Sequence, residues 1–380
     1  MKNKPSLRDA FQEQTGFDEN ALTQIGLELI ERSREAAHDS DHHRYHVGSS
    51  LLAINHRGNQ TFYDNANKIP DPLKDQGITS HDQIGEGSPT VHGEFPILYD
   101  APPSDHVFLG CNTPNCASCL KSAIMRDVDA LFVDSKSLPG FKGPNDQENP
   151  WTQDRADFWN DLCIPIARAA QVPIYAVNTD TGKLSILVNG KPPSERPKPE
   201  FPARILSEHE VHTMEHNPDL FLSEARGRRS AIGVAQNKKT GETAYIYAED
   251  SLPPGMTYAT HGNMEEQFAD AHYRLPLDPI IHMLMEASKH NLELQNGRIL
   301  TNFVPSSGRQ LDLAQVGLSE IFFTDRHVPP TDEARSAMHS LSEFGLIEYS
   351  RVKPTKGVSR IMERNGTDHS DHQLYDSHDA

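Results

Sequence analysis

The sequence predicts an α/β fold that is built twice along the chain. Stretches with apolar residues at helical spacing alternate with short runs rich in Val, Ile, Leu and Phe, which are typical of helices and buried strands. The same order of elements returns after a proline-rich stretch at 189–204. In both halves a helix long enough for a crossover separates the fourth and fifth expected strands, so we expect these two strands to be parallel.

The first half is expected to begin with an amphipathic helix over 19–37, where apolar residues recur at helical spacing. A hairpin should follow, because Gly58 and Asn59 separate two strand-like runs. The later elements are a strand at 106–111, a helix after Cys119, a strand at 129–134, a helix at 155–170 and a strand at 172–178.

The second half is expected to contain a helix around 215–227, a hairpin at 230–250, helices at 278–290, 308–316 and 331–345, and strands at 298–304, 319–325 and 346–352. The resulting division is an N-terminal extension at 1–18, a first domain at 19–188, a linker at 189–204, a second domain at 205–353 and a tail at 354–380. The linker should be stiff because it is rich in proline. The tail should be disordered because it is polar and lacks periodicity.

Composition limits the class of protein. The chain has 380 residues, four cysteines and a formal net charge of −18. No apolar run approaches the roughly 20 residues of a membrane span, and the N-terminus lacks the apolar stretch of a secretory signal. We therefore expect a cytoplasmic protein without a membrane partner. The charge disfavours a nucleic-acid partner without excluding it, since a local basic patch exists at Arg226, Arg228 and Arg229. A small metabolite fits this charge more easily.

A candidate zinc site lies in the first half. Cys116 and Cys119 form a C-x-x-C pair before an expected helix, whose first turn places both sulfurs on one side and whose dipole favours the thiolate forms. Catalytic zinc takes three protein ligands, and His92 could supply the third. Glu94 would then lie beside the fourth position, where a carboxylate can accept and donate a proton.

This H-x-E sequence followed by P-C-x-x-C resembles the signature of the zinc nucleobase deaminases, the cytidine and deoxycytidylate deaminase superfamily. The resemblance covers residues 19–180. It implies an α/β three-layer sandwich in two tandem cytidine-deaminase-like domains, each with a mixed five-stranded sheet flanked by helices. It also implies that His92, Cys116 and Cys119 bind Zn²⁺ and that Glu94 shuttles protons.

The same resemblance places the substrate contacts. Several family members contact the ribose through an asparagine at the end of the second strand. Asn67 is the first candidate for this role and Asn65 the second, and Gly93, between the histidine and the glutamate, is assigned to the same pocket.

The sequence departs from the family pattern next to the first cysteine. The family has proline directly before that cysteine, whereas here Asn115 stands between Pro114 and Cys116. This departure leaves open a wider pairing in which Cys111 and Cys116 are the metal ligands. Gly93 is a second departure, because the family normally has a small residue other than glycine there.

The second half repeats the first at an offset of 190 residues, which places Leu131 of the fourth strand over Ile321. The same offset places His92 over His282, Glu94 over Leu284, Cys116 over Ser306 and Cys119 over Arg309. A guanidinium group stays protonated and is no zinc ligand. We therefore expect the second domain to bind no zinc and to be inactive, with His282 in its core or at an interface.

The function expected from these observations is that of a zinc-dependent hydrolytic deaminase. It would act on a cytosine-type or related base of a nucleoside or nucleotide and release ammonia. A parallel fifth strand resembles the branch that contains the deoxycytidylate, guanine and tRNA adenosine deaminases. Two alternatives stay open, a nucleic-acid editing deaminase and a non-catalytic zinc-binding regulatory protein. The resemblance also implies that a homodimer could form and that the degenerate domain could act as a built-in partner.

Overall fold

The computed structural model describes residues 16–85, 88–138, 157–216, 228–257, 275–324 and 331–352. The chain divides into two compact units, and each unit combines segments from distant parts of the sequence. Unit 1 consists of Met1–Lys68, His92–Glu200 and Leu252–Pro276, and unit 2 consists of Ile69–Val91, Phe201–Ser251 and Leu277–Ala380. The expected domains were contiguous, whereas the units exchange residues 69–91 and 252–276.

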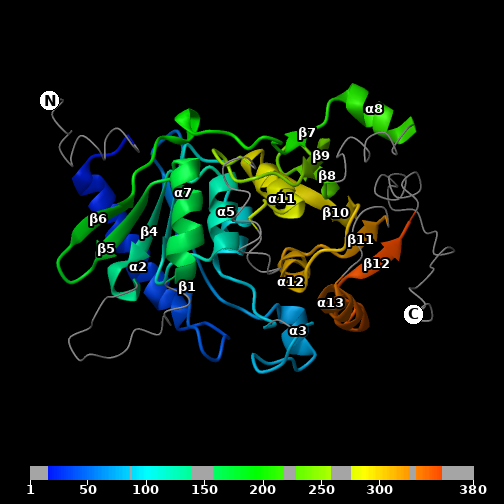
Figure 1. Ribbon diagram of the computed structural model, residues 1–380, viewed down its shortest axis with the longest axis horizontal. Helices are drawn as coiled ribbons and strands as arrows, with labels where there is room; N and C mark the ends of the chain where they lie inside the picture. Colours follow the sequence, from blue (N-terminus) through cyan, green and yellow to red (C-terminus); the bar gives the residue numbers. More distant parts are fainter. Residues whose placement is uncertain are drawn as a thin grey trace. The chain divides into compact units, whose positions relative to one another are not determined.

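Unit 1 is built on a six-stranded mixed sheet with the order β2-β1-β3-β4-β5-β6 (Figure 1). Its strands are β1 (Gly48–Ile54), β2 (Gln60–Ala66), β3 (His106–Cys111), β4 (Ala130–Asp134), β5 (Ile174–Asn178) and β6 (Lys183–Val188). β1 is antiparallel to β2 and β3, whereas β3, β4 and β5 run parallel. The predicted parallel fifth strand is therefore confirmed.

The predicted count of five strands is wrong for this sheet. β6 pairs with β5 as an antiparallel hairpin around Gly182, which has φ +65°. Four of its six residues are apolar, and Leu184 and Ile186 pack against the core, so the sequence does carry a strand signal there. The count of five came from the family resemblance, which left this strand out.

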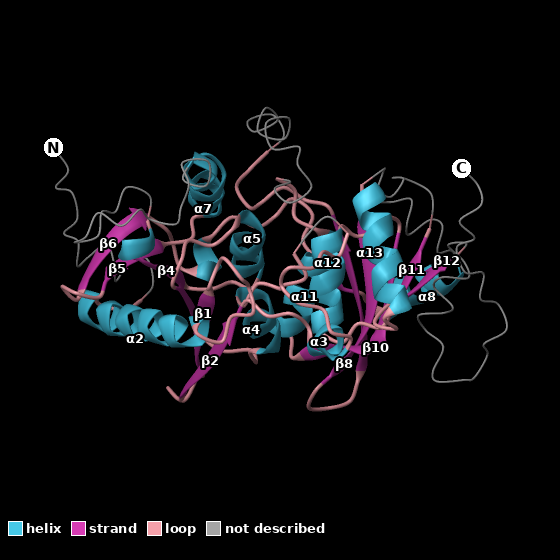
Figure 2. Ribbon diagram, turned by 90° about the horizontal axis from the view of Figure 1, so that it is seen from below, coloured by secondary structure: helices cyan, strands magenta, loops and turns pink. Residues whose placement is uncertain are grey.

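Helices cover both faces of the unit 1 sheet (Figure 2). On one face α2 (Glu19–Ala37) packs Leu22 and Leu29 against Phe108 and Phe132. Strand residues that point the other way, such as Leu109, are also buried. The second face is covered by α4 (Glu94–Asp100), α5 (Ala117–Met125) and α7 (Ile164–Ala170). A π-helical turn at Trp159–Cys163 directly precedes α7.

Unit 2 contains a second six-stranded mixed sheet, with the order β12-β11-β10-β8-β9-β7. Its strands are β7 (Arg204–Ile205), β8 (Ser230–Asn237), β9 (Thr243–Glu249), β10 (Leu292–Thr301), β11 (Glu320–Phe323) and β12 (Glu348–Arg351). β10, β11 and β12 are parallel, as predicted. The sixth strand, β7, has two residues, which are the last residue of the expected linker and the first of the expected second domain, where no apolar pattern indicates a strand.

The described helices of unit 2 are α3 (Asp71–Asp75), α8 (Glu208–His216), α11 (Pro279–Lys289), α12 (Ser307–Gln315) and α13 (Asp332–Glu343). The last three agree with the predicted helices. The helix expected around 215–227 falls mostly outside the described residues, and α8 precedes it. The expected tail lies outside the described residues as well.

The proline-rich stretch at 189–204 is docked on unit 1 over most of its length. Arg196 is 8% exposed, and its guanidinium donates hydrogen bonds to the carbonyl oxygens of Lys191, Val128 and Asp129 at 2.6, 2.6 and 2.7 Å. A buried cation held by three carbonyls fixes this stretch more firmly than proline content alone predicts.

Within the described part of the chain, no helix combines the length and the apolar character needed to cross a membrane.

Candidate metal centre

The two cysteines are held by the beginning of α5. Cys116 is the N-cap residue, with extended backbone angles of φ −68° and ψ 164°, and its Sγ accepts a hydrogen bond from the backbone N–H of Cys119 at 3.4 Å. The N-cap position turns the Cys116 side chain back over the first helical turn, where Cys119 lies. The C-x-x-C spacing therefore brings both sulfurs to the helix N-terminus, as predicted.

His92 completes the cluster from the residues just before α4. Its Nδ1 lies 3.4 Å from Cys116 Sγ and 3.3 Å from Cys119 Sγ, and the three ligand atoms lie within 4.8 Å of one another. Tetrahedral zinc with its usual bond lengths separates nitrogen and sulfur ligands by about 3.5 Å. The donor set and its spacing therefore fit zinc. Among the described residues this is the one such group of three or more His, Cys, Asp or Glu side chains.

One side of the cluster is buried in the protein and the other side faces solvent. Cys119 is 4% exposed, Cys116 is partly exposed and His92 is exposed. A hydrogen bond from the Cys119 thiol lowers the pKa of Cys116 well below its ordinary value, and neighbouring His92 lowers it further. Thiolates are the metal-binding form of cysteine, so the site is chemically prepared for a metal ion.

Cys111 is placed apart from this cluster, which answers the question of a wider cysteine pairing. Its thiol is buried and lies 3.6 Å from Ser49 Oγ and 3.8 Å from Glu94 Oε1. Burial raises the pKa of Cys111 well above its ordinary value, and the charge of Glu94 adds to this effect. A thiol that keeps its proton and donates hydrogen bonds is a poor metal ligand.

Glu94 is the first residue of α4 and is 2% exposed. Its Oε1 accepts a hydrogen bond from Asn115 Nδ2 at 3.1 Å. Its Oε2 is buried and has no hydrogen-bond partner among the described residues. A carboxylate oxygen that is buried without a partner costs free energy, so it marks a position where a ligand or a reacting group is expected.

The three predicted substrate-contact residues gather around the turn that carries His92. Asn67 is buried, and its Oδ1 accepts a hydrogen bond from the backbone N–H of Gly93 at 3.2 Å. Strand register pairs Asn65 with Ser49 and Ser49 with Cys111, which puts all three on the sheet face that Cys111 shares with Glu94. These positions agree with a role in substrate binding, which stays a prediction.

Glycine at position 93 has a packing reason. A Cβ atom there would lie 2.9 Å from the backbone of Asn65 and Ala66. The end of β2 leaves no room for the small side chain that the family pattern has at this position, and the N–H of Gly93 is engaged by Asn67.

Two residues that the sequence did not single out hold the site's helices in place. Arg126 is 3% exposed and donates hydrogen bonds to the carbonyl oxygens of Leu98, Ala101 and Pro102, at the C-terminal end of α4. It therefore joins α5 to α4, and burial lowers its pKa to about 10. Lys121 on α5 donates to the carbonyl oxygen of Pro276 at 3.0 Å.

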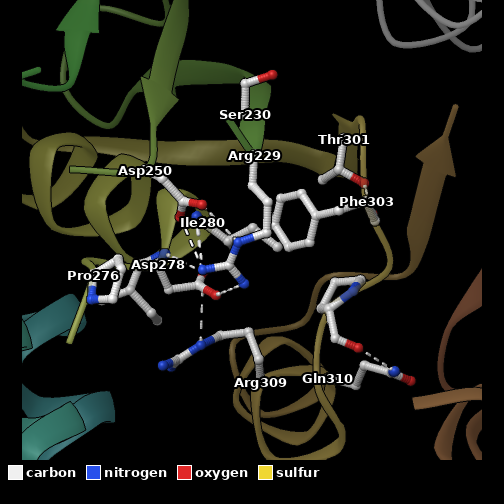
Figure 3. A network of polar contacts seen from close by, with 12 residues as sticks. Arg229, Ser230, Asp250, Pro276, Asp278, Ile280, Thr301, Phe303, Arg309 and Gln310 are labelled. Carbon is white, nitrogen blue, oxygen red and sulfur yellow. Dashed lines mark hydrogen bonds and ion pairs between the residues drawn. The ribbon is translucent and has the colours of Figure 1, made fainter. Parts of the chain in front are cut away.

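The corresponding place in unit 2 holds an ion-pair network instead of metal ligands (Figure 3). Arg229 makes two hydrogen bonds to Asp250, at 2.7 and 2.8 Å, and lies over the ring of Phe303. Arg309, at the position of Cys119, pairs with Asp312 and lies 3.8 Å from Asp278. In unit 2, the ion pair of Arg309 with Asp278 therefore links α12 to the start of α11. Unit 1 has the thiol of Cys119 at the position of Arg309.

His282 is a core residue, as predicted. It is 4% exposed, and its Nε2 accepts a hydrogen bond from the backbone N–H of Ala203 at 3.0 Å. Leu284, at the position of Glu94, is fully buried.

The local basic patch is neutralised where the structure describes it. Arg228 pairs with Glu249 at 2.6 Å, and Arg229 pairs with Asp250 at 2.7 Å, while Arg226 lies outside the described residues. The two described arginines therefore add no unbalanced positive charge that would favour nucleic acid.

No protein-family model matches this chain. No curated protein matches it either.

Proposed function

We propose that the chain is a zinc-dependent hydrolytic deaminase that acts on a cytosine-type or related base of a nucleoside or nucleotide. The reaction exchanges an exocyclic amine for a carbonyl oxygen, consumes one water and releases ammonia. The observation that carries the proposal is the carboxylate of Glu94, which is buried beside the His92, Cys116 and Cys119 cluster with one oxygen unpartnered among the described residues.

Zinc held by these three residues would supply Lewis-acid activation of water. Side chains of the site would then transfer protons and orient the substrate. Glu94 would accept a proton at Oε2 and later donate one to the leaving amine, as a general base and then a general acid. Asn67 and Asn65, at the end of β2, would orient the sugar, and the burial of Glu94 would keep bulk water from its carboxylate.

Strand order supports the same proposal and narrows it. The order β2-β1-β3-β4-β5 with a parallel fifth strand is that of the branch with deoxycytidylate, guanine and tRNA adenosine deaminases, to which the sequence is similar. The net charge of −18 and the paired state of Arg228 and Arg229 favour a small substrate within this group.

The experiment measures zinc content and ammonia release over bases, nucleosides, nucleotides and transfer RNA, with Glu94→Gln as the test variant. We expect one zinc ion per chain in both proteins and a loss of turnover of about 10²- to 10⁴-fold in Glu94→Gln, the usual contribution of general acid–base catalysis. Ammonia release that is equal in the two proteins would refute the role of Glu94. A zinc-loaded protein that is inactive on every substrate would favour the non-catalytic alternative.

A further inference from the structure

The side-chain amide of Asn115 holds one oxygen of the Glu94 carboxylate. Asn115 is 4% exposed, and its Nδ2 lies 3.1 Å from Glu94 Oε1 and 3.0 Å from Cys111 Sγ. Cys111 Sγ also lies 3.8 Å from the same Oε1. Both donors converge on Oε1, and Oε2 is the oxygen that is left.

An amide is well suited to hold a buried carboxylate. Its N–H groups are permanent donors, whereas the donors of carboxyl and imidazole groups depend on pH. A hydrogen bond to an ionised oxygen is also stronger than a neutral one, and it removes rotational freedom from the carboxylate. The contact therefore decides which oxygen of Glu94 faces the protein.

The turn before α5 does not itself require asparagine. In unit 2 the equivalent helix α12 begins in the same way, with N-cap Ser306 in extended conformation and Pro305 at the position of Asn115. The offset of 190 residues also places Leu284 over Glu94 and Thr301 over Cys111. The copy that lacks the carboxylate thus has no amide at the position of Asn115, and the hydroxyl of Thr301 donates to the carbonyl oxygen of Phe303 at 2.6 Å. This is expected if the Asn115 amide serves Glu94 and not the turn.

We propose that Asn115 is a positioning residue, which fixes Oε1 of Glu94 so that Oε2 is presented for proton transfer. The inference rests on the proposed deaminase function, and it turns a departure from the family pattern into a part of the site.

The first test exchanges donor and acceptor and needs no substrate. In Asn115→Asp, two carboxylates face each other and cannot both ionise freely, so we expect the melting temperature of the zinc-loaded protein to fall by about 2–6 °C. In Asn115→Asp combined with Glu94→Gln, the new amide donates to the new carboxylate. The double variant should then regain at least half of the melting temperature that Asn115→Asp alone loses.

Asn112→Asp is the matched control, because the Asn112 amide bonds to the backbone of Gly48 and His46 and not to Glu94. Its loss of melting temperature should be the same with Glu94 and with Glu94→Gln. An equal loss for Asn115→Asp in the two backgrounds would overturn the proposal. If Asn115→Asp does not fold, Asn115→Ala combined with Glu94→Ala gives the same comparison.

The second test separates positioning from metal binding. With a substrate that the protein deaminates, Asn115→Ala should lower kcat by about 10- to 100-fold, the size of effect that a misplaced reacting group produces. KM should change by less than about 3-fold and zinc content should stay at one ion per chain. Unchanged kcat, or loss of zinc in parallel with kcat, would overturn the proposal.

The two tests also separate this inference from the proposed function. Coupling between positions 94 and 115 in a protein without deaminase activity would refute the function and keep the contact. Deaminase activity without that coupling would refute the positioning role of Asn115 and keep the function.

Discussion

Asn112 and Asn302 make the same two hydrogen bonds in the two units. Asn112 Oδ1 accepts from the N–H of Gly48 at 3.0 Å, and its Nδ2 donates to the carbonyl of His46 at 3.0 Å. Asn302 Oδ1 accepts from the N–H of Ser230 at 2.7 Å, and its Nδ2 donates to the carbonyl of Arg228 at 2.9 Å. The two residues are separated by the repeat offset of 190, so the repeat predicted from the sequence is matched by equal hydrogen bonding at these two positions.

Asn112 and Asn302 are a feature that the two units share, whereas the positions of the two cysteines differ between the units. The asparagine that ties the third strand to the start of the first strand is present in both units. The metal ligands of unit 1 are replaced in unit 2 by Ser306 and Arg309, and Arg309 forms ion pairs with Asp312 and Asp278. The two units share a mixed six-stranded sheet, and among the described residues the cluster that could hold a metal ion is found in unit 1.

Zinc binding should depend on Cys116 and Cys119 and not on Cys111. We expect Cys116→Ser and Cys119→Ser each to lose most of the zinc, because a hydroxyl is a far weaker zinc ligand than a thiolate. Cys111→Ser should retain one ion per chain, since its thiol is protonated and bonded to Ser49 and Glu94. Metal analysis of the purified variants measures this, and zinc loss in Cys111→Ser equal to that in Cys116→Ser would contradict the ligand set.

Arg126→Met should destabilise unit 1 by about 2–4 kcal/mol, because three carbonyl oxygens around the end of α4 lose their buried donor. Urea unfolding measures the change. Arg57→Met is the control, since Arg57 is exposed in the hairpin turn and its replacement should change stability by less than about 0.5 kcal/mol. Equal effects of the two substitutions would show that Arg126 does not join α4 to α5.

His106 should contribute a pH-dependent part of the stability. The hydrogen bond to Asp129, 3.2 Å long, raises the pKa of His106 above its ordinary value of 6.5 despite partial burial. The folded state therefore binds the proton more tightly than the unfolded state. The resulting stabilisation is fully present below pH 6.5 and is lost as the pH rises through the folded pKa.

The free energy of unfolding of the wild type relative to His106→Gln should accordingly be larger at about pH 5.5 than at about pH 8.5. The difference should not exceed about 1 kcal/mol, because the His106 side chain is 38% exposed. The same comparison in an Asp129→Asn background should show a smaller dependence, because the hydrogen bond to Asp129 is the largest cause of the raised pKa and the charge of Asp105 is a further cause. A dependence of undiminished size without the Asp129 carboxylate would assign it to another group.

The docking of residues 252–257 in unit 1 can be tested with a pair of glycines. Gly255 has φ +77°, and a Cβ there would lie 2.1 Å from the carbonyl oxygen of Ala169, whereas Gly182 has φ +65° and no atom within 4 Å of such a Cβ. Both alanine variants suffer the same backbone strain, of about 1–2 kcal/mol. Gly255→Ala should lose at least about 1 kcal/mol more than Gly182→Ala, because backbone must move. Equal losses in thermal unfolding would place this segment elsewhere.

The sequence predicted the elements that local patterns encode. Helix α2, the strands β3 and β4 and the C-x-x-C helix follow from apolar periodicity and from residues next to one another in the chain. The ligand cluster was predicted as well, because His92 and the two cysteines each directly precede or open a helix. The parallel β5 followed from the length of its crossover.

Other features depend on contacts between distant residues, for which the chain carries no local signal. Arg126 resembles any cation at the end of a helix, and its burial becomes visible when α4 is placed beside it. Asn115 was noticed as an interruption of a motif, whereas its partner, Glu94, lies 21 residues away. β7 has two residues, too few to show any periodicity. β6 is apolar at four of six positions, and it was missed because the count of five strands came from the resemblance.

The interleaving of the units constrains the order in which the protein can mature during synthesis. The three candidate metal ligands have all been made by residue 119, yet unit 1 is complete only when Pro276 has left the ribosome. In unit 2, Gly85 packs against Ala337, which is synthesised about 250 residues later. This contact can therefore form only near the end of translation. Neither unit can therefore fold as a contiguous N-terminal domain during synthesis, and unit 2 can be completed only near the end of elongation or after release.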